Sequence, residues 1–220
     1  MKISWLGQAG LLFEKDNFKI MIDPYLSDSV EKVNPKNYRR VPVLESLFKI
    51  KPDIMIFTHN HLDHYDSETV QRYITPESAV TVLAPSSVWC DVRKIGGDNN
   101  FVCFNRHTQW TANGISFRAV KAEHSDEYAI GVIIEENNKK YYITGDTLYN
   151  TKIFRDLPQG IDVVFLPVNG VGNNMNMEDA HRFVKKCGAN KAVPLHFGMF
   201  DEIVPQGFDI VPKIYEEIEL

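Results

Sequence analysis

The sequence predicts an α/β protein made of two similar halves, in which two sheets pack together with helices on the outside. Two observations lead to this prediction. Each half opens with apolar, strand-like stretches, and each then alternates buried strands with helical segments. With 220 residues and 44% hydrophobic content, the chain can bury a sizeable core. No linker, low-complexity tract or short repeat interrupts it, so residues 1–220 are expected to form one domain.

The first half begins with three short strands, expected in the partly alternating stretches "ISWLG", "GLLFE" and "FKIMIDP". A loop rich in Pro, Asn and charge follows. The stretches "DIMIFTH" and "AVTVLAP" are almost wholly apolar, which is typical of strands covered on both faces. "SETVQRYI" has helical spacing with Ser67 as its predicted cap, and "SSVWCDVRKIGG" is expected to be a helix closed by glycines.

The second half repeats this plan. "GISFRAVKA" and "YAIGVIIEENNKKYYITGD" are expected to be strands, with a hairpin turn at Asn137 and Asn138. "DVVFLPV" and "KAVPLHF" are two further buried strands. The clearest helix of the chain lies between them, because Asn176 can cap it and an apolar stripe with i, i+3, i+4, i+7 spacing runs on to Gly188.

Composition limits the partners and the compartment. The formal net charge is -5, so the surface as a whole would repel nucleic acid and anionic membranes. The three cysteines form no CxxC pair and are expected to be reduced thiols that pack as small buried hydrophobes. The N-terminus lacks the apolar region of a signal peptide. We therefore expect a cytoplasmic protein whose partner is a small molecule, not a nucleic acid or a membrane.

The densest chemical signal is the stretch "THNHLDH", directly behind the apolar run "IMIF". His59 and His61 stand two residues apart, so an extended or turning backbone can aim both imidazoles at one point. Asp63 and His64 can face a second point nearby. Neutral imidazole and carboxylate suit zinc, iron and manganese, and each such ion typically needs about three to five protein ligands. The remaining ligands must come from elsewhere in the chain.

Three later residues of ligand type each follow an apolar strand. His124 comes after "ISFRAVKAE", Asp146 ends "YYITGD", and His196 ends "AVPLH". In layered α/β proteins the loops at the carboxyl ends of strands gather binding residues. Taken singly, His124 and His196 are better explained as satisfied or solvent-facing histidines. The first cluster is not, since crowding several imidazoles without a metal is costly.

In this order, "THNHLDH", His124, "TGDT" and "PLHFG" resemble the metallo-β-lactamase superfamily. The resemblance covers nearly the whole chain and implies a four-layer αββα sandwich with a two-metal site at one edge of the sheets. The implied metals are two divalent ions, zinc or manganese, with iron as a further option. The implied ligands are His59, His61 and His124 for the first metal, Asp63, His64 and His196 for the second, and Asp146 as the bridge. Asp23 matches the family's early aspartate, which braces the metal loop.

Within the superfamily, "WLGQAGLLFE", "IDPYLSDSV", "GDTLYN", "MNMEDA" and "PLHFGMF" are most similar to the L-ascorbate-6-phosphate lactonase group. This resemblance implies a lactonase or esterase in which a metal-bound hydroxide attacks the carbonyl of a small anionic, phosphorylated substrate. Asp63 would also carry a proton to the leaving group. A phosphodiesterase is the alternative, and a metal-binding regulatory protein without turnover is a third. Association into a homo-oligomer is a further expectation from the group.

Four more residues are candidates for substrate contacts. Arg39 and Arg40 in "NYRR" could clamp an anion, because arginine matches phosphate in a bidentate fork, or could form a solvated loop pair. Tyr149 could reach a substrate oxygen or serve only in packing. Asn169 opens the loop "NGVGNNMN", which could offer N–H groups to an anion or be a flexible turn.

Overall fold

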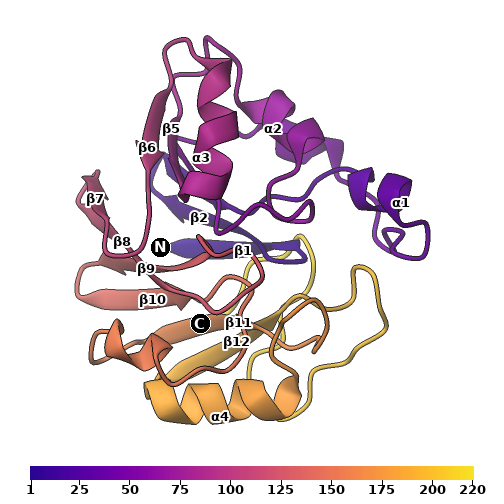
Figure 1. The fold of residues 1–220 in the computed structure, drawn as a ribbon, viewed down its shortest axis with the longest axis vertical. Coiled ribbons are helices and arrows are strands. Elements are labelled where there is room, and N and C mark those ends of the chain that lie inside the picture. The colour runs from indigo at the N-terminus through magenta and orange to yellow at the C-terminus, as the bar shows by residue number, and fades with distance from the viewer.

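The computed structural model describes residues 1–220 as two six-stranded sheets with helices on their outer faces (Figure 1). The first sheet contains β1 (Lys2–Gly7), β2 (Gly10–Lys15), β3 (Phe18–Ile22), β4 (Ile54–Ile56), β5 (Thr81–Ala84) and β6 (Asn100–Cys103). The second contains β7 (Gln109–Ala112), β8 (Ile115–Lys121), β9 (Ile130–Glu136), β10 (Lys139–Ile143), β11 (Val163–Pro167) and β12 (Lys191–Leu195). The predicted four-layer sandwich is confirmed.

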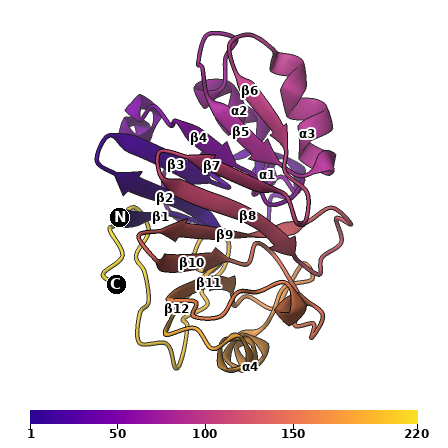
Figure 2. The same ribbon diagram turned by 90° about the vertical axis from the view of Figure 1, so that its left-hand side faces the viewer.

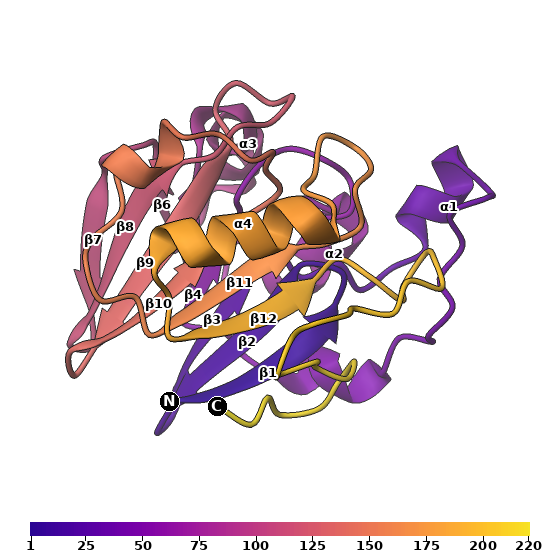
Figure 3. The ribbon, with the colours of Figure 1, turned by 90° about the horizontal axis from the view of Figure 1, so that it is seen from below.

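Helices are few and short. The α-helices are α1 (Ser29–Val33), α2 (Ser67–Tyr73), α3 (Ser86–Val92) and α4 (Met177–Cys187), and the 3₁₀ turns are η1 (Glu45–Lys49), η2 (Arg93–Ile95) and η3 (Ile153–Arg155). Figures 2 and 3 show α2 and α3 on the side of the first sheet and α4 on the side of the second. None of these helices has the length and apolar character that crossing a membrane requires.

The two halves have similar strand plans, in which antiparallel strands come first along the chain and parallel strands follow. In the first sheet, β1 to β3 are antiparallel and β3 to β6 are parallel. In the second sheet, β7 to β10 are antiparallel and β10 to β12 are parallel. Since parallel strands end at the same edge of a sheet, the loops that follow them gather at one edge. The candidate site is built from such loops.

Alternate side chains of the central strands enter two different cores. In β4, Ile54 and Ile56 belong to the large core between the sheets, whereas Met55 belongs to a smaller core beneath α2 and α3. All three side chains are at most 1% exposed. Successive residues of a strand point to opposite faces, so a strand buried on both faces is apolar throughout. This explains why "IMIF" shows no polar alternation.

Of the two predicted N-terminal helix caps, one is confirmed and the other is wrong. Asn176 caps α4, because its side chain accepts a hydrogen bond of 2.9 Å from the backbone N–H of Asp179. The predicted cap at Ser67 is wrong: Asp66 caps α2, and its carboxylate accepts from the N–H groups of Glu68 and Thr69. A carboxylate at this position also interacts favourably with the positive end of the helix dipole.

Among the other local predictions, some are confirmed and some are wrong. The Asn137–Asn138 hairpin turn is confirmed, with φ of 50° and 64° in the left-handed region that such a turn needs. Strands β6 and β7 were not predicted from the sequence, because their side chains are only partly buried and the apolar pattern of these stretches is weak. All three cysteines are free, as expected, but the prediction that they are buried is wrong, because Cys90 is exposed and Cys103 and Cys187 are partly exposed.

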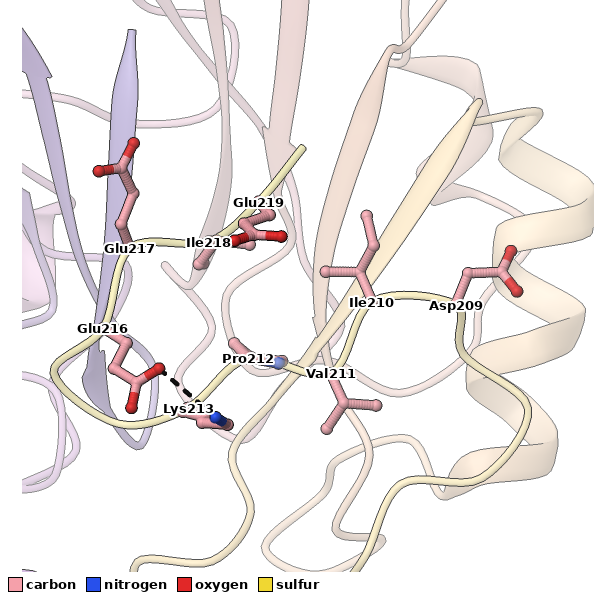
Figure 4. Close-up of a pocket in the computed structure, with 9 residues that line it drawn as sticks. All are labelled: Asp209, Ile210, Val211, Pro212, Lys213, Glu216, Glu217, Ile218 and Glu219. Atoms are coloured by element: carbon pink, nitrogen blue, oxygen red, sulfur yellow. Dashed lines mark ion pairs between the residues drawn. The ribbon is translucent and has the colours of Figure 1, made fainter.

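The C-terminal segment closes the free edge of the first sheet. The backbone N–H groups of Tyr215 and Ile218 donate to the carbonyls of Trp5 and Ile3, at 2.6 and 2.7 Å. Residues 209–213 and 216–219 line a pocket of about 320 Å³ (Figure 4). Its polar side chains are mostly carboxylates, and none of the predicted ligands lines it.

Candidate metal centre

The seven predicted ligands converge, although they come from four separate loops. Their donor atoms form three overlapping groups in which all atoms lie within 4.8 Å of one another. The groups are His59, His61 and His124; His59, His64 and Asp146; and Asp63, His64 and His196. The middle group shares one histidine with each of the others. Asp146 therefore lies where a bridging carboxylate would lie.

The loop after β4 is held in place by Asp23, which directly follows β3. One carboxylate oxygen of Asp23 accepts the backbone N–H of Thr58 at 2.8 Å, and the other accepts the Thr58 hydroxyl. The carbonyl of Thr58 accepts the N–H of Ile130 from the second sheet at 3.0 Å. The two sheets are thus joined directly in front of the histidine motif.

Gly145 allows the chain after β10 to approach this motif closely. Its φ is +61°, and a Cβ atom there would lie 2.7 Å from the Ile130 carbonyl oxygen and 3.0 Å from the Thr58 Cβ. No larger residue fits without displacing backbone. The close approach brings Asp146, only 4% exposed, into the cluster.

Hydrogen bonds fix the proton position on two of the histidines. The Thr58 hydroxyl donates its single hydrogen to Asp23, so its oxygen accepts from Nδ1–H of His59, which lies 3.1 Å away. The lone pair of His59 is then on Nε2, a buried atom without any hydrogen-bond partner. Similarly, Nδ1 of His64 lies 2.9 Å from Asp23, a pure acceptor, which leaves Nε2 facing the cluster.

The remaining two histidines of the first group follow the same rule. Nδ1 of His124 lies 3.2 Å from the carbonyl oxygen of Asn173, so it carries the proton, and Nε2 faces inward. That Nε2 lies 3.1 Å from Nδ1 of His61, whose other nitrogen contacts the Ser125 hydroxyl. Partners of this kind on the outward nitrogen are the usual surroundings of metal-binding histidines.

Charge divides the cluster into two environments. Burial lowers the pKa of His59 well below its usual value and also lowers that of His124, so both imidazoles are neutral. Burial opposes protonation of His196 as well, but the carboxylates of Asp146 and Asp63 outweigh it and raise its pKa to about 9. Carboxylates around His64 likewise hold its pKa well above the usual range, although burial opposes the shift.

Comparisons with known proteins identify the family. The model of the β-lactamase superfamily domain matches residues 19–197. The chain belongs to this superfamily. A UPF0173 metal-dependent hydrolase of Thermoplasma acidophilum is 27% identical over 247 residues, covering 100% of this chain and 99% of the relative. A UPF0173 protein of Pyrococcus furiosus is 27% identical over 209 residues, covering 94% and 89% of the two chains.

Solved structures agree on the metallo-β-lactamase fold. The isothiocyanate hydrolase from Delia radicum gut bacteria has a TM-score of 0.76 at 19% identity, covering 100% of this chain and 99% of that one. A metallo hydrolase of Ignicoccus hospitalis has a TM-score of 0.70 at 23% identity, covering 90% and 82%. At such identities the likeness concerns the fold alone.

The donor set fits the divalent metals that metallo-β-lactamase superfamily members use. Imidazole nitrogens and carboxylate oxygens converge, and the buried Nε2 of His59 lacks any partner within the protein. An unpaired buried nitrogen is unfavourable unless something binds it, and a metal ion meets that need. Family and donor set together make this chain a metal-dependent hydrolase of the superfamily.

Two of the residues proposed to contact substrate, Arg39 and Arg40, contact other protein groups. The guanidinium of Arg39 donates to the Tyr25 carbonyl and the Tyr215 hydroxyl, both at 2.9 Å, and its side chain is 3% exposed. Arg40 pairs with Glu202 at 2.9 Å. Neither contact resembles a free anion clamp.

Tyr149 and Asn169 also contact protein groups. The Tyr149 ring packs against Phe154 and Phe183, with centroids 5.7 and 6.3 Å away, which favours the packing interpretation. The Asn169 amide lies 2.9 Å from Nδ1 of His196, so this residue contacts a predicted ligand.

Sequence reasoning missed several polar residues that hold the ligands. They are Gln8, Thr58, Ser125, the Asn173 carbonyl and Asn174, whose amide donates to Asp146 at 2.8 Å. Thr58 and Ser125 adjoin predicted ligands in the chain, so sequence position alone could have suggested them. Gln8 lies far from every ligand in sequence, and only the fold brings it there.

Proposed function

We propose that the protein hydrolyses a small lactone or carboxylic ester. The observation that carries this proposal is the position of Asp63 within the cluster. Its side chain is 20% exposed, whereas those of His64, Asp146 and His196 are 0%, 5% and 7% exposed. Asp63 is thus the member of the second ligand group that is most accessible to a substrate and to water.

The metal ions would be held by the inward donor atoms. His59, His61 and His124 would bind one ion and Asp63, His64 and His196 the other, with Asp146 between them. When bound, two divalent ions lower the pKa of water, polarise a carbonyl group and stabilise developing negative charge. The histidines' outward hydrogen bonds keep the ligands oriented for this purpose.

Asp63 is placed to move the proton of the reaction. Burial opposes its ionisation, but His64 and His196 outweigh this effect and lower the pKa of the carboxyl well below its usual range. Bound metal ions would replace these histidine protons as the positive charges that keep Asp63 a carboxylate. This carboxylate accepts a proton from the attacking water and returns it to the leaving alkoxide, as a general base and then a general acid.

The lactone preference is supported by the resemblance of five stretches to the lactonase group. Arg39 is committed to Tyr25 and Tyr215 and is buried, which argues against it as a phosphate clamp. Arg40 is held only by an exposed ion pair with Glu202, so its contact with a phosphorylated substrate such as L-ascorbate 6-phosphate stays a prediction. We therefore propose a small substrate defined by its carbonyl group, with the phosphorylated lactone as one member of the class.

A substrate panel tests the proposal. Protein reconstituted with zinc or with manganese is given L-ascorbate 6-phosphate, uncharged lactones, p-nitrophenyl acetate and bis-(p-nitrophenyl) phosphate. We expect hydrolysis of at least one lactone or ester, abolished by chelation and reduced in Asp63→Asn. His181→Ala is the matched control, because His181 stacks on Phe208 and contacts no ligand. Turnover of the phosphodiester alone would instead establish a phosphodiesterase, and no turnover would favour a metal-binding protein without catalysis.

A further inference from the structure

The turn between β1 and β2 carries Gln8 into the second ligand group. Gln8 belongs to the stretch "WLGQAG" and is 3% exposed. Its φ of 52° lies in the left-handed region, which a residue with a Cβ atom rarely adopts. Such a conformation persists only where the surrounding structure enforces it, and it often marks a functional position.

Two hydrogen bonds hold the backbone of Gln8 in this conformation. Its carbonyl oxygen accepts from the Trp5 indole N–H at 3.0 Å and from the backbone N–H of His196 at 2.9 Å. His196 also has a left-handed backbone, with φ of 62°. The turn between β1 and β2 is therefore tied directly to the loop that presents His196.

The side-chain amide of Gln8 contacts two predicted ligands at once. Its nitrogen lies 2.8 Å from Oδ2 of Asp63, and because a carboxylate only accepts, the amide donates one hydrogen there. The same nitrogen lies 3.1 and 3.2 Å from the two ring nitrogens of His196. The amide thus packs against the imidazole of His196 while it donates to Asp63.

We propose that Gln8 is a positioning residue that sets the second ligand group by holding Asp63 and His196 in register. The inference rests on the proposed metal-dependent function and adds a residue from the far end of the chain to it. Loss of the amide should weaken binding of the second metal ion, because residues that hydrogen-bond to metal ligands typically contribute roughly 10–100-fold to metal affinity. None of the contacts of Gln8 involves His59, His61 or His124, so the first ion should be unaffected.

Two variants separate this role from simple packing. Gln8→Met keeps a side chain of similar length but removes both donor hydrogens. Gln8→Gly adopts a positive φ freely, so it keeps the turn while removing the side chain. Gln71→Ala, at an exposed position of α2, is the control. Metal-free protein of each variant is titrated with Co²⁺, and binding is followed by calorimetry and by the visible absorption of the ion.

We expect the wild type and Gln71→Ala to take up two Co²⁺ ions. In Gln8→Met and Gln8→Gly the second ion should bind roughly 10–100-fold more weakly, while the first keeps its affinity and its spectrum. Wild-type affinity for both ions in both variants would overturn the inference, and so would equal weakening of both ions. Failure of the wild type to bind any ion would instead contradict the proposed function itself.

Discussion

At the residue scale, the partners of the outward ring nitrogens decide which lone pairs face the cluster. Asp23 serves two histidines at once, because it accepts from Nδ1 of His64 and takes the hydrogen of the Thr58 hydroxyl that accepts from His59. Removing this carboxylate would release both proton positions. The expected brace of the metal loop thus acts through proton placement as well as through backbone contacts.

Metal affinity of the second group should depend on pH. His196, with a pKa of about 9, and His64, with a raised pKa, are protonated near neutrality in the metal-free protein. A metal requires the unprotonated ring, so binding releases protons. Affinity should therefore rise with pH up to about 9, by roughly tenfold per pH unit for each proton displaced.

Calorimetric titration in buffers of different ionisation enthalpy measures this proton release. The first group is the internal control, because burial already lowers the pKa of His59 and His124 and leaves them neutral. Binding of the second ion without proton release at neutral pH would contradict the charge assignment.

The neighbouring arginines should differ in what they contribute to stability. Arg39 is buried and donates to Tyr25 and Tyr215, so Arg39→Ala should lower the free energy of unfolding by about 1.5–3 kcal/mol. Arg40 forms an ion pair with Glu202, whose side chain is 82% exposed, so Arg40→Ala should cost about 0–1 kcal/mol. Chemical denaturation of both variants provides the measurement, and equal losses would contradict these environments.

At the element scale, the close approach after β10 can be tested with two glycines of similar backbone conformation. Gly145 and Gly160 have φ of 61° and 70°, but a Cβ atom at Gly160 would meet nothing within 4 Å. Gly160→Ala should cost only the left-handed conformation, about 1–2 kcal/mol. Gly145→Ala should cost about 1–3 kcal/mol more, because it also collides with backbone.

Thermal unfolding of the two variants, together with their metal content, provides the comparison. Gly145→Ala should lose metal as well, since the collision displaces Asp146, whereas Gly160→Ala should keep it. Equal stability and equal metal content in the two variants would show that the chain at Gly145 does not need its close contact with Thr58 and Ile130.

Most elements could be predicted from apolar pattern, but not all. Strands such as β4 and β11 are buried on both faces and are therefore apolar throughout. By contrast, β6 and β7 are half exposed, so their apolar pattern is weak. The pairing of β7 is nevertheless local, since it forms a hairpin with β8 across Asn113 and Gly114. The cap of α2 was misplaced by one residue, because Asp66 and Ser67 are adjacent and both are good caps.

At the scale of the whole molecule, the candidate centre joins the two sheets. His59 to His64 follow the first sheet's β4, whereas His124, Asp146 and His196 follow strands of the second. Ions bound at this junction stabilise the folded state but not the unfolded state. At a free concentration about 100-fold above Kd, the gain is about 2.7 kcal/mol per ion.

Metal loading should therefore raise the melting temperature by roughly 5–10 °C per ion, and chelation should reverse the shift. Differential scanning calorimetry of metal-free and reloaded protein checks this. Asp146→Asn should show a smaller shift, because its carboxylate lies between the two groups. An unchanged melting temperature after loading would argue against ions at the junction.

The cluster from His59 to His64 could be predicted from spacing and residue type, whereas His124, Asp146 and His196 are assigned as ligands through the resemblance to the superfamily. Their partners distant in sequence could not be predicted: Gln8 and Asn174 are common polar residues whose roles depend on three-dimensional proximity. Arg39 shows the opposite case, since a residue type suited to anions is used within the fold.

The most direct test of the central claim is anomalous X-ray diffraction from crystals of the metal-loaded protein, collected at the absorption edge of the metal. We predict two peaks. One should lie within bonding distance of His59 Nε2, His61 and His124 Nε2, and the other within bonding distance of Asp63, His64 Nε2 and His196, with Asp146 reaching both. Fully loaded crystals with no peak at these atoms, or with peaks only elsewhere on the molecule, would contradict the account.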